Sequence, residues 1–407
     1  MPNVIFVVGT MPEIIKSVDV ARRLASSGLR VTIYDTLQNR EDAFDVPANV
    51  EIKRTRVVRA ECHDDMAWVA SCASDIAAMA GDMVVVQGDT YSALAGAHGA
   101  VSAGARLVHI EAGLRSRDPL SPFPEEMIRT FIDTQSEILF CATPTDFEDL
   151  GETANLAAKE TFVVGNTVCD PIFRHRERLA LASAQPSGVL VSLHRRENRQ
   201  HQALILEALA RLVQSFPATH FRMLKRGLLA QTDAGRFGPN ATMVDLSEHL
   251  RFLEMLAGSQ VAVCDSGGIL EEAVTLGVPL ICLRRTLERG RFVEGVECLD
   301  PADMAGPRLP ALMNRFLSAR GNNRGPLRET FGDGRSAERI ATALFSHVRG
   351  PLVERGQSAT AADRAHAAVL VPFERPKTVE RPNATSEPAL KDEPRRYATA
   401  GGDRCEP

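Results

Sequence analysis

The sequence predicts an α/β protein built from two Rossmann-like, doubly wound domains that face a central cleft. Short apolar runs rich in β-branched residues alternate with helix-like stretches, a pattern typical of parallel sheets with crossover helices. The 407 residues are enough for two domains of ordinary size, and the pattern divides near residues 170–187. In such sheets ligands lie beyond the carboxyl ends of the strands, so functional residues are expected just after them.

Composition and charge exclude several classes of protein. The formal net charge is −5 and no dense Lys/Arg block occurs, so nothing supports a nucleic-acid partner. Apolar runs such as residues 4–8 are strand-sized, too short to span a membrane. The first residues lack the features of a secretory signal, which predicts a cytoplasmic location. No cluster of side chains has metal-ligand spacing, so we expect neither a metal nor another cofactor.

The first predicted strand leads directly into a helix start. Thr10 and Glu13 have the spacing of a capping box after the apolar run 4–8, and Pro12 suits the first helical turn. The N–H groups of such a turn suit a phosphate, with Lys16 one turn later as a point charge. The alternative is a structural turn with a surface lysine. The remaining strands predicted in the first half are residues 31–34, 83–87, 106–110, 138–142 and 162–164.

Carboxylates follow two of these strands and a proline-fixed loop. Asp89 comes after strand 83–87, Glu111 comes after strand 106–110, and Glu125 lies in the loop that enters the next helix. Each acid alone has a structural alternative, such as the N-cap of a helix for Asp89. Together they predict acid/base chemistry around one reacting carbon.

The second half predicts an anion site that faces those acids. Its predicted strands are residues 188–193, 220–224, 260–264 and 279–283. After the first of them stands His194 beside Arg195, for which a solvated charge run is the alternative. After strand 260–264, Ser266 and two glycines form a turn into a helix, where an anion can approach the helix N-terminus. Glu272, one turn later, is a candidate acceptor for ribose hydroxyls.

These motifs, in this order, resemble the non-hydrolysing UDP-N-acetylglucosamine 2-epimerase family, whose fold resembles that of GT-B glycosyltransferases. The matching segments are GTMPEIIK (9–16), QGDT (87–90), HIEAGLR (109–115), SPFPEE (121–126), GNTVCD (165–170), HRREN (194–198), DSGGILEEA (265–273) and GDGRSAERI (332–340). The resemblance implies inversion at C2 of a UDP-linked 2-acetamido sugar by elimination and re-addition of UDP, and a homodimer.

The resemblance also implies roles for individual residues. The acid/base carboxylates would be Asp89, Glu111 and Glu125, with His194 implicated in activity. The nucleotide contacts would be Phe252, Ser266, Gly267, Glu272 and Arg289. From their places in the sequence alone, further candidate contacts for the substrate or UDP are Lys16, Arg115, Arg129, Arg195 and Gly268. The predicted organisation is an N-terminal domain (1–171), a UDP-binding domain (172–334), a helix that packs back on the first domain (335–350) and a proline-rich disordered tail (351–407).

One departure from the family stands in the opening turn. Met11 occupies the position where the family usually has an arginine that is associated with binding of the nucleotide phosphates. This favours a second interpretation, a catalytically weakened UDP-sugar binding protein. A glycosyltransferase of similar fold is a third, which the HIEAGLR and SPFPEE segments disfavour.

Overall fold

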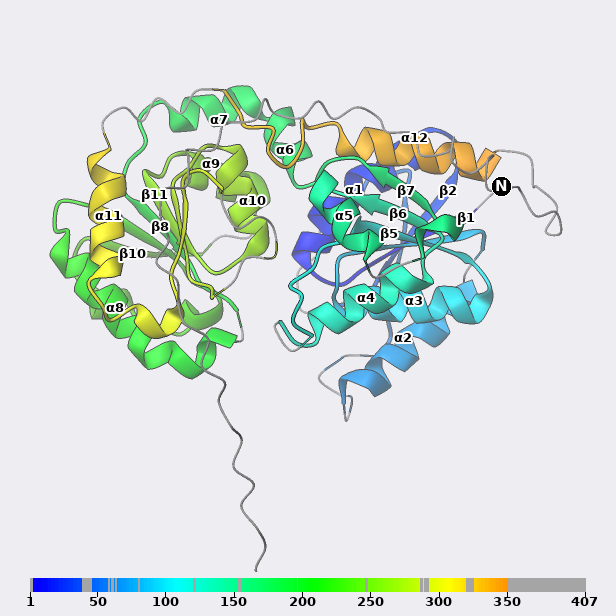
Figure 1. Ribbon diagram of the computed structural model, residues 1–407, viewed down its shortest axis with the longest axis horizontal. Coiled ribbons are helices and arrows are strands. Elements are labelled where there is room, and N and C mark those ends of the chain that lie inside the picture. Colours follow the sequence, from blue (N-terminus) through cyan, green and yellow to red (C-terminus); the bar gives the residue numbers. More distant parts are fainter. Residues whose placement is uncertain are drawn as a thin grey trace, which may run out of the picture. The chain divides into compact units, whose positions relative to one another are not determined.

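Two parallel sheets interleaved with helices make up the described part of the chain, as the sequence predicts (Figure 1). The computed structural model describes residues 3–38, 46–57, 59, 62, 64–79, 81–119, 122–152, 155–195, 197–245, 248–285, 288, 293–319 and 326–349. The tail predicted for residues 351–407 lies outside this range.

The first sheet has seven strands in the order β3-β2-β1-β4-β5-β6-β7, and every neighbouring pair is parallel. The strands are β1 (Asn3–Val8), β2 (Arg30–Asp35), β3 (Glu51–Arg54), β4 (Met83–Gln87), β5 (Arg106–Ala112), β6 (Ile138–Cys141) and β7 (Glu160–Val163). The helices between them are α1 (Met11–Ser26), α2 (Asp65–Met79), α3 (Tyr91–Ala103), α4 (Glu125–Gln135) and α5 (Pro144–Gly151).

The second sheet has six parallel strands in the order β10-β9-β8-β11-β12-β13. They are β8 (Val189–Ser192), β9 (Phe221–Leu224), β10 (Ala241–Val244), β11 (Val261–Cys264), β12 (Leu280–Cys282) and β13 (Val296–Cys298). The associated helices are α6 (Cys169–Arg174), α7 (Arg176–Ser183), α8 (Gln202–Ser215), α9 (His249–Ala257), α10 (Gly267–Thr275) and α11 (Arg308–Ser318).

Three strands were absent from the sequence-based prediction: β3, β10 and β13. Each is the outermost strand of its sheet, and several of their side chains are partly or fully exposed. An edge strand needs no continuous apolar run, because one side of it is not covered by another strand. Apolar patterning therefore finds the central strands and the edge strand β7, and misses the other three edges.

The last described helix, α12 (Ser336–Arg349), follows the second sheet in sequence but packs on the first. Ile340 and Leu344 belong to the same buried cluster as side chains of β1 and β2, and α12 lies against α1 (Figure 1). Asp170 fixes its start, because its carboxylate accepts hydrogen bonds from Ser336 N (3.1 Å) and Ala337 N (2.7 Å). Within the described residues, no helix is long and apolar enough to cross a membrane.

Candidate active site

A cleft of about 690 Å³ opens at the carboxyl ends of strands from both sheets. In the first sheet β1 and β4 are neighbours, and in the second β8 and β11; these are the points where the strand order reverses. The predicted residues that line the cleft are Lys16, Asp89, Glu111, Glu125, Arg129, His194, Arg195, Phe252, Ser266, Gly267, Gly268 and Glu272.

The turn between β1 and α1 has the predicted helix start, but the side chain of Glu13 binds two of its N–H groups. Glu13 is buried, and one of its carboxylate oxygens accepts hydrogen bonds from Gly9 N (2.9 Å) and Thr10 N (2.8 Å). The bond from Thr10 N is that of the predicted capping box, and these two N–H groups, which precede the helix, are not available to a phosphate. Burial raises the pKa of Glu13 to about 7, although the hydrogen bonds it accepts oppose that effect.

This raised pKa predicts a dependence of stability on pH. The contribution of Glu13 is fully present below its ordinary pKa of 4.5 and is lost as pH rises to about 7. The loss is about 3 kcal/mol, because each pH unit in this window contributes about 1.4 kcal/mol. We expect Glu13→Gln to gain stability relative to the parent protein by about this amount between pH 4.5 and pH 7, as measured by urea unfolding.

The control for this prediction is Glu148→Gln, which changes an exposed carboxylate on α5. Its free energy of unfolding is expected to follow that of the parent protein across the same pH range. Parallel curves for Glu13→Gln and the parent protein would contradict the prediction.

Glu111 sits on an irregular backbone at the end of β5. Its φ is +73°, and the pairing between β5 and β6 shifts register between Ile110 and Ala112. A non-glycine residue in this region costs on the order of 1–3 kcal/mol and is typical of functional sites. Lys16 Nζ lies 2.8 Å from both carboxylate oxygens of Glu111, and the amide of Gln87 donates to one of them. The strained backbone thus presents a carboxylate whose direction is fixed by two donors.

In this structure Lys16 therefore pairs with carboxylates and is not an isolated charge for a phosphate. Besides Glu111, its Nζ lies 3.6 Å from Oε2 of Glu271, which belongs to α10 of the second sheet. Lys16 thus contacts residues on both sides of the cleft.

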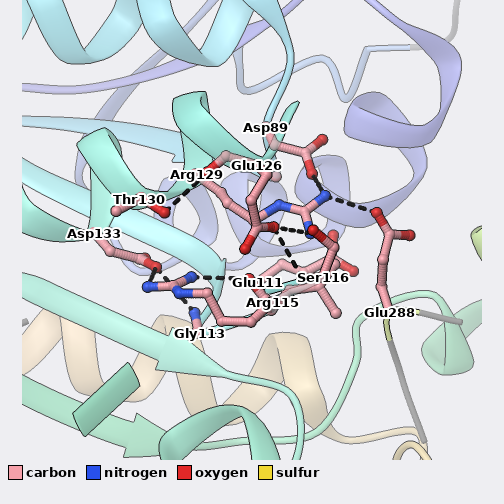
Figure 2. A network of polar contacts seen from close by, with 12 residues as sticks. Asp89, Glu111, Gly113, Arg115, Ser116, Glu126, Arg129, Thr130, Asp133 and Glu288 are labelled. Atoms are coloured by element: carbon pink, nitrogen blue, oxygen red, sulfur yellow. Dashed lines mark hydrogen bonds and ion pairs between the residues drawn. The ribbon is translucent and has the colours of Figure 1, made fainter. Parts of the chain in front are cut away.

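Arg129 of α4 joins carboxylates from three parts of the chain (Figure 2). Its guanidinium, with 3% of the side chain exposed, is paired with Asp89, lies 3.0 Å from Glu126 Oε2, and lies 2.9 Å from Glu288 Oε1. Thr90 is the N-cap of α3, since its hydroxyl accepts from Ala93 N, so Asp89 does not have that structural role. Arg129 instead holds Asp89 at the cleft.

Glu288 brings a negative charge from the second sheet to this cluster. Besides Arg129, it pairs with Arg284 (2.9 Å) and lies 3.6 Å from Arg195 Nη2. These three guanidinium groups outweigh the effect of burial and hold the pKa of Glu288 well below its usual range. The carboxylate of Glu288 is thus paired with three arginines that line the cleft.

Glu125 is a carboxylate of the cleft with an unused hydrogen-bond acceptor. Its Oε2 atom is buried and has no hydrogen-bond partner among the described residues. Burial raises the pKa of Glu125, and the neighbouring charge of Asp89 adds to this effect. A buried carboxyl group with a raised pKa and an unused oxygen is suited to exchange a proton with a bound molecule.

In the second sheet, Asp265 fixes the loop that carries His194. Its fully buried carboxylate accepts hydrogen bonds from His194 N (3.0 Å), Arg195 N (3.0 Å) and Asn198 Nδ2 (2.9 Å). The His194 side chain remains 39% exposed. Burial lowers the pKa of His194 against the opposing charge of Asp265, which favours the neutral ring. The neighbouring residue Ser266 stands at the predicted turn into a helix and is the N-cap of α10, where its hydroxyl accepts from Ile269 N.

Beside Ser266 the cleft is lined by aromatic and charged side chains. His249 Nε2 lies 2.6 Å from Glu272 Oε1, and its ring stacks on Phe252 with a centroid distance of 6.3 Å. The guanidinium of Arg226 lies 5.4 Å from the centroid of Phe252. Arg226 donates to the hydroxyl of Ser192 (3.1 Å) and forms no ion pair with a carboxylate of the described residues. It is thus a cleft cation without a direct ion pair in that part of the chain, although the charges of Glu272 and Asp265 act on it from a longer distance.

Comparisons with known proteins agree with this arrangement. The family model described as UDP-N-acetylglucosamine 2-epimerase matches residues 33–345. The chain belongs to this epimerase family. A Thermotoga maritima protein, provisionally named a UDP-N-acetylglucosamine 2-epimerase, is 30% identical over 85% of this chain and 97% of its own length. The Methanocaldococcus jannaschii protein named UDP-N-acetylglucosamine 2-epimerase is 28% identical over 83% of this chain and 97% of its own.

A solved structure supports the two-domain, GT-B-like fold. The Methanocaldococcus jannaschii epimerase in complex with UDP-GlcNAc and UDP has a TM-score of 0.69 and 25% identity, and the match covers 84% of this chain and 99% of that chain. Membership of the epimerase family places the chain among the isomerases, as the sequence predicts.

Two of the predicted binding residues are not placed in the cleft. Arg115 is not among the lining residues; its side chain turns inward and its Nη2 lies 2.7 Å from Asp133 Oδ2, because that buried carboxylate needs a cation (Figure 2). Arg289 lies outside the described residues.

Several residues of the site were missed from the sequence. They are Gln87, Asp265, Arg226, His249, Arg284 and Glu288. Asp265 could have been found, because it stands at the end of a buried strand directly before Ser266. The others follow no motif that indicates their partners.

Proposed function

We propose that this epimerase-family chain inverts C2 of a UDP-linked 2-acetamido sugar, converting UDP-N-acetylglucosamine to UDP-N-acetylmannosamine or acting on a modified relative. The observation that carries the proposal is the carboxylate Glu125, whose buried oxygen lacks a partner beside Asp89 in the same cleft as the Ser266 turn. The product would supply precursors for cell-surface polysaccharide. The resemblance further leads us to propose a cytoplasmic homodimer of the non-hydrolysing branch.

The proposed reaction begins with loss of the proton from C2. One of the carboxylates Asp89, Glu111 and Glu125 accepts that proton while the bond between C1 and the phosphate oxygen breaks, so that UDP leaves with the electron pair. The products of this step are a glycal with a C1–C2 double bond and UDP. Re-addition of UDP to C1 and delivery of a proton to the opposite face of C2 complete the inversion.

The second sheet would stabilise the departing UDP. Arg195 and Arg284 line the cleft near the N-terminus of α10, where the helix dipole favours negative charge. Both arginines are paired with Glu288, so the diphosphate must compete with that carboxylate for them. Stabilising charge on the leaving group is the contribution expected to lower the barrier most.

The experiment that tests the proposal is proton exchange in deuterated water. Purified protein incubated with UDP-N-acetylglucosamine should incorporate deuterium at C2 and produce the C2 epimer, both visible by NMR. A parallel reaction with a UDP-2,3-diacetamido-uronate tests a modified substrate. Absence of exchange with both sugars would overturn the assignment.

A second candidate function is a UDP-sugar binding protein with weakened catalysis. It is favoured by Met11, an uncharged side chain that lines the cleft beside Lys16. Calorimetry would then show tight binding of UDP with no exchange at C2.

A further inference from the structure

We propose that His109 is held as a buried imidazolium that fixes the positions of Asp89 and Glu111, which makes it a positioning residue for the reaction. The effect on turnover rests on the proposed function, whereas the charge state of the ring does not. His109 lies on β5, two residues before Glu111, and its side chain is fully buried. It does not line the cleft.

Both nitrogens of the His109 ring face oxygen atoms that accept hydrogen bonds. Nδ1 lies 2.6 Å from Asp133 Oδ1, and Nε2 lies 2.8 Å from the carbonyl oxygen of Gly88. A neutral imidazole has one N–H, so either neutral tautomer would direct a lone pair at an oxygen. The imidazolium, with two N–H groups, satisfies both contacts.

A fixed cation other than His109 favours the ionised carboxylate of Asp133. Burial alone would raise the pKa of Asp133, but the charge and hydrogen bond of Arg115 act against burial and lower it. Arg115 Nη2 lies 2.7 Å from Asp133 Oδ2. The other charged group that faces Asp133 is Lys159, from the segment before β7. On the side of β4, the group that faces the His109 ring is the carbonyl of Gly88.

Asp133 holds the backbone on both sides of Glu111. One carboxylate oxygen binds the ring of His109. The other accepts from the backbone N–H of Gly113 at 3.3 Å (Figure 2). These two contacts bracket the register shift at which Glu111 has its positive φ. Because a strained backbone persists only where its surroundings determine it, the His109–Asp133 pair maintains the direction of Glu111.

The second ring nitrogen extends the same support to Asp89. Gly88 accepts from His109 Nε2 through its carbonyl and donates its own N–H to Ile110 O at 3.0 Å. Gly88 has a φ of +68° and directly precedes Asp89. One ring therefore ties the turn that carries Asp89 to the strand that carries Glu111.

The charge state of His109 can be tested in the unmodified protein. Protein labelled with ¹⁵N at histidine should show both nitrogens of the His109 ring protonated at pH 7, in two-bond ¹H–¹⁵N spectra. The spectrum of His109→Asn identifies the signals. A His109 ring with one unprotonated nitrogen at pH 7 would overturn the proposal, whether or not the protein turns over a sugar.

The positioning role can be tested with two variants that each keep one contact. Asparagine places an amide near Nδ1 and glutamine places one near Nε2, so His109→Asn retains the bond to Asp133 and His109→Gln retains the bond to Gly88. We expect each variant to lower kcat for C2 exchange at least tenfold, with Kd for UDP within about twofold of the parent value. His98→Gln, on α3 and outside the cleft, is the matched control and should retain the parent kcat.

A merely structural role predicts different results from these variants. Loss of UDP binding in proportion to the loss of kcat, or an unchanged kcat in both variants, would contradict positioning by His109. If the parent protein shows no exchange at C2, the proposed function fails, and the NMR measurement still decides the charge state of the ring.

Discussion

Glu111→Gln is expected to lower the rate of C2 proton exchange by about 10²- to 10⁴-fold, the range typical for loss of a general acid or base. Glutamine has the same shape but cannot take up the proton at neutral pH. The Kd for UDP should change little, because Glu111 lies on the first sheet. The cleft residues at the start of α10, where we propose that UDP binds, follow a strand of the second sheet. Deuterium incorporation at C2 and calorimetry with UDP measure the two quantities.

Glu137→Gln is the control for this variant, because Glu137 is an exposed acid in the turn after α4. It should retain the exchange rate of the parent protein. An unchanged rate in Glu111→Gln would exclude Glu111 from proton transfer. Tight UDP binding without exchange in the parent protein would instead favour the weakened UDP-sugar binder.

Met11→Arg is expected to tighten UDP binding by about ten- to 150-fold. The new guanidinium would add a charge-assisted hydrogen bond to the diphosphate, worth roughly 1.5–3 kcal/mol. Met11 already lines the cleft, so the longer side chain has a path to the ligand. Calorimetry with UDP and with uridine separates the two parts of the nucleotide: the Kd for UDP should fall, and the Kd for uridine should not.

Arg226→Gln is the matched variant, because it removes a cleft cation that forms no direct ion pair with a described carboxylate. It should weaken UDP binding by a similar factor. If Met11→Arg leaves the Kd unchanged while Arg226→Gln raises it, the protein already supplies the missing charge through Arg226. An unchanged Kd in both variants would show that neither position contacts the diphosphate.

The sequence predicts the fold better than it predicts the contacts. The central strands and the helix start at Thr10 follow from local patterns, because apolar runs and capping residues act within a few positions. The strand-end positions of Asp89 and Glu111 follow from the same patterns. The edge strands β3 and β13 have no such pattern. The bond from Thr10 N to Glu13 is part of the predicted capping box, whereas the additional bond from Gly9 N has no such pattern.

The site residues that the sequence analysis misplaced or missed depend on partners that are distant in the sequence. Arg115 belongs to the same short segment as Glu111, yet its side chain is directed by Asp133, which lies on the next helix. Glu288 meets Arg129 across 159 positions of sequence. No local pattern contains such pairings, because they arise only when the strands and helices have been assembled.

Helix α4 has a consequence for how this site can change over generations. Glu125, Arg129 and Asp133 follow one another at intervals of four residues and so share one face of the helix, where they serve the cleft, Asp89 and the His109 pair in turn. A mutation that shifts α4 therefore disturbs Glu125, Arg129 and Asp133 at once, together with the residues that they contact. The loop of the second sheet that carries Glu288 is tied to the same helix, because Glu288 pairs with Arg129.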